Sequence, residues 1–564
     1  MAQQSSNSDS SAQQAAHVTQ PLSPNPPYLR EFAEEILNVR VLDPQTAYQI
    51  KGQPGLKPTV FVADSLLVRG QHPDTLNTLE RVAGEAGFQL VWDPRIKQDQ
   101  ALLNRAKLTD DQRSQLQDLW VARVKITPVE EPLEAVFKPI DTWRLLQAYR
   151  VAVGFDAERM ADVGLEHPTS TADVKANPMT GVHPMTGVHP MTGVHPMTGV
   201  HPMTGVHPMT GVHPANNYVY PGWGGRQPVN WLGRAPQPTL DKSSTVRRPV
   251  VAILDSGIGI HPWLMDKSII RNPKVMGQLI GIPPVSIQAD LTGVMDKLVG
   301  NLEQDSGHGT FIAGLVRQAC PDAKLLGVRL FHDNGVVAEG ELLRTLNLMV
   351  LWQMLALNGV KGCEPVDVLS LSLGYFHEQP EDVAFDALLL GPLAALGKLG
   401  VAVVVSAGNE STSRPGYPAA FAPYEVNGAP AGVPDDTDRI PVSTVGAKNP
   451  DGTIALFSND GPWVKYLRPG AALVSTFPIT YNASALPSNA VVTANGETRA
   501  GLDPDNFAAG FAVWSGTSFA APFFAGQLAE LVLKRYKAGD DSADPVKSVP
   551  RLRKVLAAIP VRPT

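Results

Sequence analysis

The chain has little of several features that define common protein classes. Only two cysteines, Cys320 and Cys363, occur in 564 residues. That is too few for a disulfide framework, so we expect both to be reduced and buried, with a single bridge between them left open. No run of about 18 apolar residues could span a membrane. The first 20 residues have neither the basic start nor the apolar stretch of a secretory signal, so we expect a cytoplasmic protein.

Strong charge is absent as well. The net charge is −7, spread over 47 basic and 54 acidic residues, and it gives no reason to expect nucleic acid as a partner. The acidic run of Asp435, Asp436 and Asp438 is more simply a solvated loop than a cation site. We therefore expect no nucleic acid, no membrane contact and no cofactor. The length exceeds what one hydrophobic core usually organises, so more than one domain is expected.

Three polar residues stand beside glycines at junctions between expected strands and helices. Asp255 ends a buried apolar strand, and the carboxyl ends of parallel strands are where ligand chemistry gathers. His308 precedes a run with helical spacing, Phe311 to Ala319. Ser518 follows Gly516 at the turn from an extended run into an apolar helix. Taken singly, these residues are more simply a solvated turn aspartate, a capping histidine and an N-cap serine.

Taken together they predict nucleophilic catalysis. A serine hydroxyl needs a base to take its proton and a third group to orient that base. The order Asp, His, Ser along the chain is that of subtilisin. The chain resembles the subtilisin-like serine protease (subtilase) family, because Asp255 matches its strand-Asp-Ser/Thr-Gly motif, His308 its His-Gly-Thr-x-x-Ala-Gly motif and Ser518 its Gly-Thr-Ser-x-Ala-x-Pro motif. Asn409, after Val403 to Gly408, matches the asparagine of the family's oxyanion hole, and the four motifs span about residues 245 to 540.

The resemblance implies a serine endopeptidase that acts on a polypeptide substrate. It assigns Asp255, His308, Ser518 and Asn409 to catalysis, and calcium, which is common in the family, stays unassigned. It also implies that an extended substrate pairs as an added strand, with the substrate-binding residues Ser372, Leu373, Gly374, Ala407 and Gly408. Many relatives have a second glycine where this chain has Tyr375, which leaves the shape of the specificity pocket open. Two alternatives are a dedicated processing protease that matures one partner and a non-catalytic peptide-binding module on a protease fold.

Strands and helices alternate after Val250, which predicts an α/β domain over residues 249–564, with a parallel sheet covered by helices on both faces as in subtilisin. The expected helices are Glu339–Leu357, Glu381–Leu399, Phe519–Leu533 and Pro550–Ile559, and the expected strands after Val250–Asp255 are Lys324–Phe331, Val366–Leu373, Val401–Ser406, Ile440–Gly446, Ala472–Thr476 and Phe511–Trp514. The segments Gly277–Asp305, Glu410–Arg439 and Pro478–Asp505 are expected to be surface loops.

Residues 28–166 are expected to form a small α+β domain. The expected elements are strand Thr59–Ala63, helix Asp74–Ala86, strand Phe88–Trp92, a helical insertion over Asp99–Asp118, strand Val121–Ile126, helix Ile140–Tyr149 and strand Arg150–Val153. The order β-α-β-β-α-β is that of a ferredoxin-like unit. It also resembles the subtilisin propeptide, which in the family chaperones folding and then plugs the active site, so intramolecular inhibition by residues 28–166 is expected. An unrelated sensor or docking domain is the alternative.

Residues 1–27 are expected to be disordered, and residues 167–248 to form a Pro- and Gly-rich linker. This linker holds six exact copies of Met-Thr-Gly-Val-His-Pro from Met179 to Pro214. The repeats are open to three interpretations, which are a metal-binding array, a repeated scissile bond and a spacer whose copy number drifts. The aromatic residues of Asn216–Arg248 are costly to leave in water, so we expect that part to lie along a folded surface.

Overall fold

The computed structural model describes residues 37–562, apart from residues 54, 71, 130–138, 172–217, 284–293, 297–299, 333, 380–386 and 487–489. The expected disorder of residues 1–27 and the six repeats therefore lie outside the described residues.

A parallel sheet of seven strands forms the centre of the larger part of the chain. Its order is β10 (Ile269–Arg271), β15 (Lys324–Arg329), β9 (Val250–Asp255), β17 (Val368–Leu371), β19 (Ala402–Ser406), β22 (Ser443–Lys448) and β23 (Tyr466–Pro469). Strands β9, β17 and β19 are continuous runs of buried residues, as expected for parallel strands that are covered on both faces. The predicted α/β sheet is confirmed, whereas the short strands β10 and β23 were not predicted.

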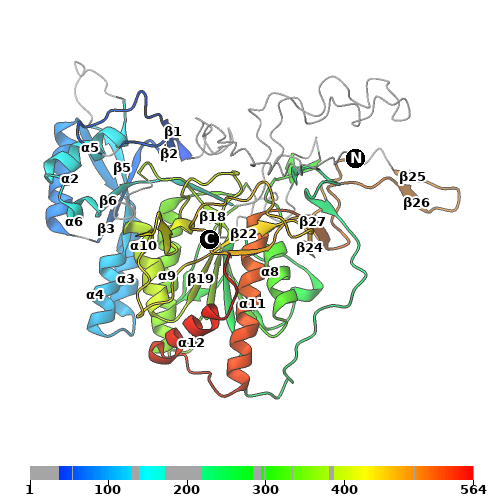
Figure 1. The fold of residues 1–564 in the computed structure, drawn as a ribbon. Coiled ribbons are helices and arrows are strands. Elements are labelled where there is room, and N and C mark those ends of the chain that lie inside the picture. Colours follow the sequence, from blue (N-terminus) through cyan, green and yellow to red (C-terminus); the bar gives the residue numbers. More distant parts are fainter. Residues whose placement is uncertain are drawn as a thin grey trace, which may run out of the picture.

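Helices cover both faces of this sheet, as predicted (Figure 1). Alternate residues of β9 point to opposite faces, so that Ala252 and Leu254 join one buried cluster while Val251 and Ile253 join the other. The first cluster includes α9 (Glu339–Leu357) and α10 (Ala387–Lys398), and the second includes α8 (His308–Ala319), α11 (Thr517–Lys537) and α12 (Pro545–Ala557).

Two predicted strands lie outside the parallel sheet. β24 (Leu473–Thr476) and β27 (Phe511–Trp514) pair antiparallel, and β8 (Gln227–Pro228) adds a third antiparallel strand. The strand that leads to Ser518 therefore belongs to a separate small sheet, contrary to prediction. β27 alternates buried and half-buried residues, which is typical of an antiparallel sheet with one covered face.

The smaller part is a four-stranded antiparallel sheet in the order β4 (Phe88–Trp92), β5 (Val121–Pro128), β3 (Ser65–Arg69) and β6 (Val163–Leu165), with α2 (Pro73–Glu85), α5 (Thr142–Ala152) and α6 (Ala157–Met160). Its element order along the chain includes the predicted β-α-β-β-α-β series, but two strands differ. The segment predicted as the first strand is β2 (Thr59–Val62), which pairs with β1 (Val39–Leu42) instead. The predicted last strand, Arg150–Val153, is wrong because it continues α5, and β6 takes its place.

The predicted helical insertion is a pair of helices, α3 (Arg95–Arg105) and α4 (Asp110–Leu119), that lies beside α9 and α10 (Figure 1). Leu102, Leu103 and Leu116 of this pair belong to the same buried cluster as the residues of α9. The smaller and larger parts of the chain are therefore joined by a shared hydrophobic core.

Where they are described, the predicted surface loops contain short hairpins, the first of which begins just before Gly277. These are β11 (Lys274–Val275) with β12 (Gln278–Leu279), β13 (Val294–Asp296) with β14 (Asn301–Leu302), β20 (Tyr424–Val426) with β21 (Ala429–Ala431), and β25 (Ala490–Val492) with β26 (Thr498–Ala500). Two turns of 3-10 helix, Pro262–Leu264 and Ala419–Phe421, also occur. Both cysteines are free thiols, with Cys320 buried and Cys363 half-buried. No helix of the described residues is long and apolar enough to cross a membrane.

Candidate active site

Asp255 and His308 are in direct contact. Asp255 is the last residue of β9, and its two carboxylate oxygens lie 2.8 and 3.0 Å from Nδ1 of His308. The backbone N–H of Ser256 donates to Oδ1 of Asp255 at 2.7 Å, which fixes the carboxylate. Both side chains are buried. A carboxylate held against Nδ1 fixes the orientation of the imidazole ring.

The glycines beside His308 allow this contact. His308 begins α8 after Gly307, whose φ of 80° lies in the left-handed region that glycine favours. A Cβ on Gly309 would lie 2.3 Å from the carbonyl oxygen of Gly257 and 3.0 Å from Oδ1 of Asp255. The His-Gly pair is therefore required by the close approach of α8 to the end of β9.

The helix start that holds Ser518 packs against the same imidazole through the residue after Ser518. Ser518 is the second residue of α11, and the ring of the following residue, Phe519, lies 5.2 Å from the His308 ring between centroids. Trp514, at the end of β27, packs edge-on against His308 at 5.6 Å. Ser518 is buried, and its Oγ donates a long hydrogen bond of 3.4 Å to the carbonyl oxygen of Ser372. The Oγ of Ser372 in turn donates to the carbonyl oxygen of Ser518 at 2.9 Å.

Asn409 reaches the start of α11. Its Oδ1 accepts a hydrogen bond from the backbone N–H of Thr517 at 2.9 Å, and the N–H of Gly408 donates to Oγ1 of Thr517 at 3.1 Å. This bond holds the Asn409 side chain at the start of the helix that contains Ser518. Sequence reasoning missed Asn459, whose amide bonds to the carbonyl oxygen of Ala407 and the N–H of Glu410 and so holds this loop.

Four of the five residues predicted to bind substrate line one pocket. They are Leu373, Gly374, Ala407 and Gly408. The fifth, Ser372, contacts Ser518 as described above. Tyr375, which stands where many relatives have a second glycine, borders the pocket too, together with Phe376 and Tyr417. Aromatic rings therefore restrict this pocket.

A strand from the smaller part of the chain forms part of the wall of this pocket, which we call the groove from here on, since Pro168, Ser170 and Thr171 also line it. β7 (Pro168–Thr171) pairs antiparallel with β16 (Val336–Ala338) on one side and with β18 (Leu373–Gly374) on the other. Thr171 lies opposite Leu373, one residue from Ser372, and its Oγ1 donates to Oδ1 of Asp305 at 2.9 Å. The segment predicted to receive an extended substrate thus already receives a strand of the same chain. No sequence signal marked β7, which is short, polar and begins with proline.

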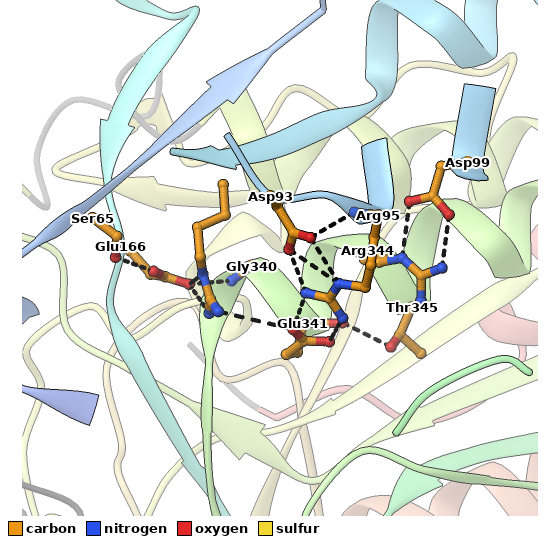
Figure 2. A network of polar contacts seen from close by, with 10 residues as sticks. Ser65, Asp93, Arg95, Asp99, Glu166, Gly340, Glu341, Arg344 and Thr345 are labelled. Atoms are coloured by element: carbon orange, nitrogen blue, oxygen red, sulfur yellow. Dashed lines mark hydrogen bonds and ion pairs between the residues drawn. The ribbon is translucent and has the colours of Figure 1, made fainter. Parts of the chain in front are cut away.

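The start of α9, directly after β16, is held by a polar network from the smaller part (Figure 2). Glu166, at the entry to β7, accepts a hydrogen bond of 3.1 Å from the N–H of Gly340 in the first turn of α9, where the helix dipole favours a carboxylate. Figure 2 shows the ion pairs farther along the helix, where Arg95 bonds to Glu341 at 2.9 Å and Arg344 makes a two-bond pair with Asp99 at 2.7 and 2.9 Å. This network was not predicted.

The segment after residue 217 supports both His308 and Ser518. The Nη1 of Arg226 donates to the carbonyl oxygens of Glu303, Gln304 and Ser306 at 2.7, 3.0 and 3.3 Å, in the loop that leads to His308. Its guanidinium lies 5.4 Å from the Trp514 ring. Ser515 donates to the carbonyl oxygen of Gly224 at 2.7 Å. The predicted packing of this aromatic segment along a folded surface agrees with these contacts.

Among the described residues, no group of three or more His, Cys, Asp or Glu side chains could hold a metal ion. The acidic run that sequence reasoning considered and set aside lies in ion pairs, because Asp435 pairs with Arg553, Asp436 with Arg439 and Asp438 with Lys398.

An aspartate and an imidazole in contact at the carboxyl end of a parallel strand, packed against a helix start that carries a serine, are groups of the kind that a serine hydrolase uses. The model of the subtilase family of peptidases matches residues 247–551, more than half of the chain, and the chain belongs to this family of serine proteases.

Solved structures resemble the chain at low similarity. A lanthipeptide protease is 19% identical over 54% of this chain and 79% of its own, with a TM-score of 0.35. A cold-adapted subtilisin-like serine proteinase is 18% identical over 57% and 88%, with a TM-score of 0.30. The self-cleaved protease domain of PatA is 20% identical over 55% and 88%, with a TM-score of 0.33. A comparison with curated proteins found no significant match.

Proposed function

We propose that this protein is a serine endopeptidase with Asp255, His308 and Ser518 as its catalytic triad and Asn409 in its oxyanion hole. The observation that carries the proposal is the bond of both Asp255 oxygens to Nδ1 of His308, beside the helix start that holds Ser518. The burial of these three residues supports it, because electrostatic contacts are stronger in a site from which water is excluded.

The proposed reaction follows from the roles of these groups. Nε2 of His308 takes the proton of Ser518 as Oγ attacks the peptide carbonyl, and then gives it to the leaving amine. Asp255 keeps the imidazole in the required tautomer and stabilises its positive charge. The Asn409 amide and the backbone N–H of Ser518 stabilise the oxyanion.

We further propose that β7 keeps the enzyme latent. Its pairing with both β16 and β18 supports this, since an extended substrate would need the same two strands. The register supports a position for the first cut as well. Thr171 is paired with Leu373, and Ser372, the next residue toward the nucleophile, contacts Ser518. We therefore expect self-cleavage at or beside the Ala172–Asp173 bond.

Mass spectrometry of the purified wild-type chain and the Ser518→Ala chain tests the proposal. The wild-type chain should yield fragments that meet close to residue 172, and Ser518→Ala should stay intact. A fluorophosphonate should label wild-type Ser518 and no residue of the variant. Casein cleavage by the Ser518→Ala chain at the wild-type rate would contradict the triad, and fragments that meet far from residue 172 would contradict the proposed position of β7.

A dedicated processing enzyme that matures one partner is a second candidate. The observation that favours it is the closed polar pocket that surrounds His167, just before β7, because a buried pocket of this kind selects strongly among side chains. Rapid cleavage of one protein with failure on casein and generic peptides would support this narrower role, whereas broad casein cleavage would contradict it.

A further inference from the structure

His167, which directly precedes β7, is enclosed between two carboxylates. Its Nδ1 lies 2.9 Å from Oε2 of Glu339, and its Nε2 lies 3.1 Å from Oε2 of Glu378. The ring of Tyr375 stacks on the imidazole at 4.7 Å with an interplanar angle of 18°, and the Tyr375 hydroxyl donates to Glu339 at 3.1 Å. The His167 side chain is almost fully buried. Two carboxylates and a stacked ring are complementary to a planar cation.

The walls of this pocket belong to the protease part of the chain. Glu339 is the first residue of α9, directly after β16, while Tyr375 and Glu378 follow β18. The smaller part contributes Arg150, whose guanidinium lies 3.7 Å from Glu378. Release of β7 together with the smaller part after self-cleavage would remove His167 and Arg150 together, and the two carboxylates would lose both of these cations. An empty pocket would therefore attract another cation of similar shape.

Contacts next to the pocket also favour the residues that follow His167. The backbone of His167 is held by Glu339 at both ends, because its N–H donates to the Glu339 carboxylate at 3.1 Å and its carbonyl accepts from the Glu339 N–H at 2.8 Å. Pro168, opposite Ala338, has no N–H to satisfy. The hydroxyl of Thr169 donates to the carbonyl oxygen of Val337 at 3.0 Å. The groove thus holds the sequence His-Pro-Thr-Ser.

A similar order of residues recurs later in the chain. From Met179 to Pro214 the chain repeats Met-Thr-Gly-Val-His-Pro, so that the first five repeat histidines begin a His-Pro-Met-Thr series. Histidine and proline match His167 and Pro168, methionine replaces Thr169 and lacks its hydroxyl, and a threonine stands where β7 has Ser170. These copies begin shortly after Thr171 on the same chain, so a cut near residue 172 leaves them attached to the protease part at high effective concentration.

We propose that Glu339, Glu378 and Tyr375 form a subsite for a histidine followed by proline, and that the repeats occupy this subsite once β7 leaves. The inference rests on the proposed function in one respect, since self-cleavage beside β7 is what would release it. The preferred ligands of the groove are then peptides in which His-Pro stands as far before the scissile bond as His167 and Pro168 stand before the Ala172–Asp173 bond. The repeats, on the same chain, compete with these peptides.

Two full-length chains test the inference. Both carry Ser518→Ala to prevent self-cleavage, and both carry His167→Ala with Thr171→Asp, which removes the imidazole and sets a carboxylate against Asp305. One keeps the six repeat histidines, and in the other these are alanine. Hydrogen exchange of residues 336–339 and 373–375 reports whether the groove is filled. We expect exchange to be about tenfold faster or more in the alanine chain. Equal exchange in the two chains would overturn the proposal.

Peptides added to the alanine chain provide a second measurement. Met-Thr-Gly-Val-His-Pro-Met-Thr-Gly should restore slow exchange, and the same peptide with alanine for histidine should not. Adding Glu339→Gln and Glu378→Gln to the alanine chain should make the two peptides slow exchange equally. A histidine peptide that still slows exchange more than the alanine peptide would overturn the role of the carboxylates. Because exchange needs no catalysis, these results stand apart from the proposed function. Failure of fluorophosphonate to label wild-type Ser518 would refute the protease while leaving the subsite result intact.

Discussion

Raising the pH should loosen the contact between β7 and the protease groove through His167. Burial by itself would lower the pKa of this imidazole, but hydrogen bonds to Glu339 and Glu378 outweigh burial and raise the pKa to about 10. The unfolded value is about 6.5. A raised pKa in the folded state means that the stabilising contribution is complete below about pH 6.5 and is lost as the pH rises through about 10.

The size of the loss of stability follows from the difference between the folded and unfolded pKa values of His167. Each pH unit between the two pKa values weakens the contribution of His167 by about 1.4 kcal/mol, so about 2 to 3 kcal/mol should be lost between pH 7 and pH 9. The other charged or titratable groups around the ring are Arg150, His377 and the two glutamates. These groups are the same in a variant that differs only at residue 167. Their own titration therefore cancels to first order when the unfolding free energies of the two chains are compared.

Urea unfolding of two full-length chains isolates the effect. Both carry Ser518→Ala, and one also carries His167→Gln, which keeps a polar side chain that cannot ionise. The unfolding free energy of the histidine chain should exceed that of the glutamine chain by an amount that shrinks by about 2 to 3 kcal/mol from pH 7 to pH 9. A difference that stays constant over this range would refute a protonated His167 between the glutamates.

Three further outcomes are expected. Asn409→Ala should lower kcat by about 10² to 10³ with little change in KM, as loss of the corresponding asparagine does in subtilisin, and equal turnover on a peptide substrate would remove Asn409 from the oxyanion hole. Gly309→Ala should abolish fluorophosphonate labelling of Ser518, because its Cβ would lie 2.3 Å from a backbone oxygen of Gly257, and normal labelling would contradict this packing. Thr171→Asp should raise the initial labelling rate at pH 7 about tenfold or more by repulsion from Asp305, and an unchanged rate would argue against latency through β7.

Much of the site could be predicted because its motifs combine local geometry with chemistry. Helix α9 begins and ends where its apolar pattern predicted, and His308 begins α8. The contact of Asp255 with His308 is present, while the catalytic roles stay predictions. The resemblance placed Leu373 and Gly408 in the substrate groove, and both line the pocket described above.

The elements that could not be predicted depend on contacts between segments that are far apart in the chain. Arg150–Val153 has the β-branched residues of a strand, yet α5 runs to Ala152 because the helix buries Tyr149 and Arg150. The three residues of β6 are too few for a periodic signal. β7 has no apolar pattern, and it becomes a strand because β16 and β18, more than 160 residues farther along the chain, supply its backbone partners. Local sequence cannot encode such a partner.

Strand β8 and Arg226 lie before residue 247, where the family match begins. A recombinant fragment trimmed to the family boundaries would lack the guanidinium that ties three carbonyl groups ahead of His308, and would leave β27 without its outer neighbour. The scaffold of the site therefore extends at least to Gly224, ahead of the family boundary, and inactivity of a shorter piece would reflect a damaged scaffold instead of absent chemistry.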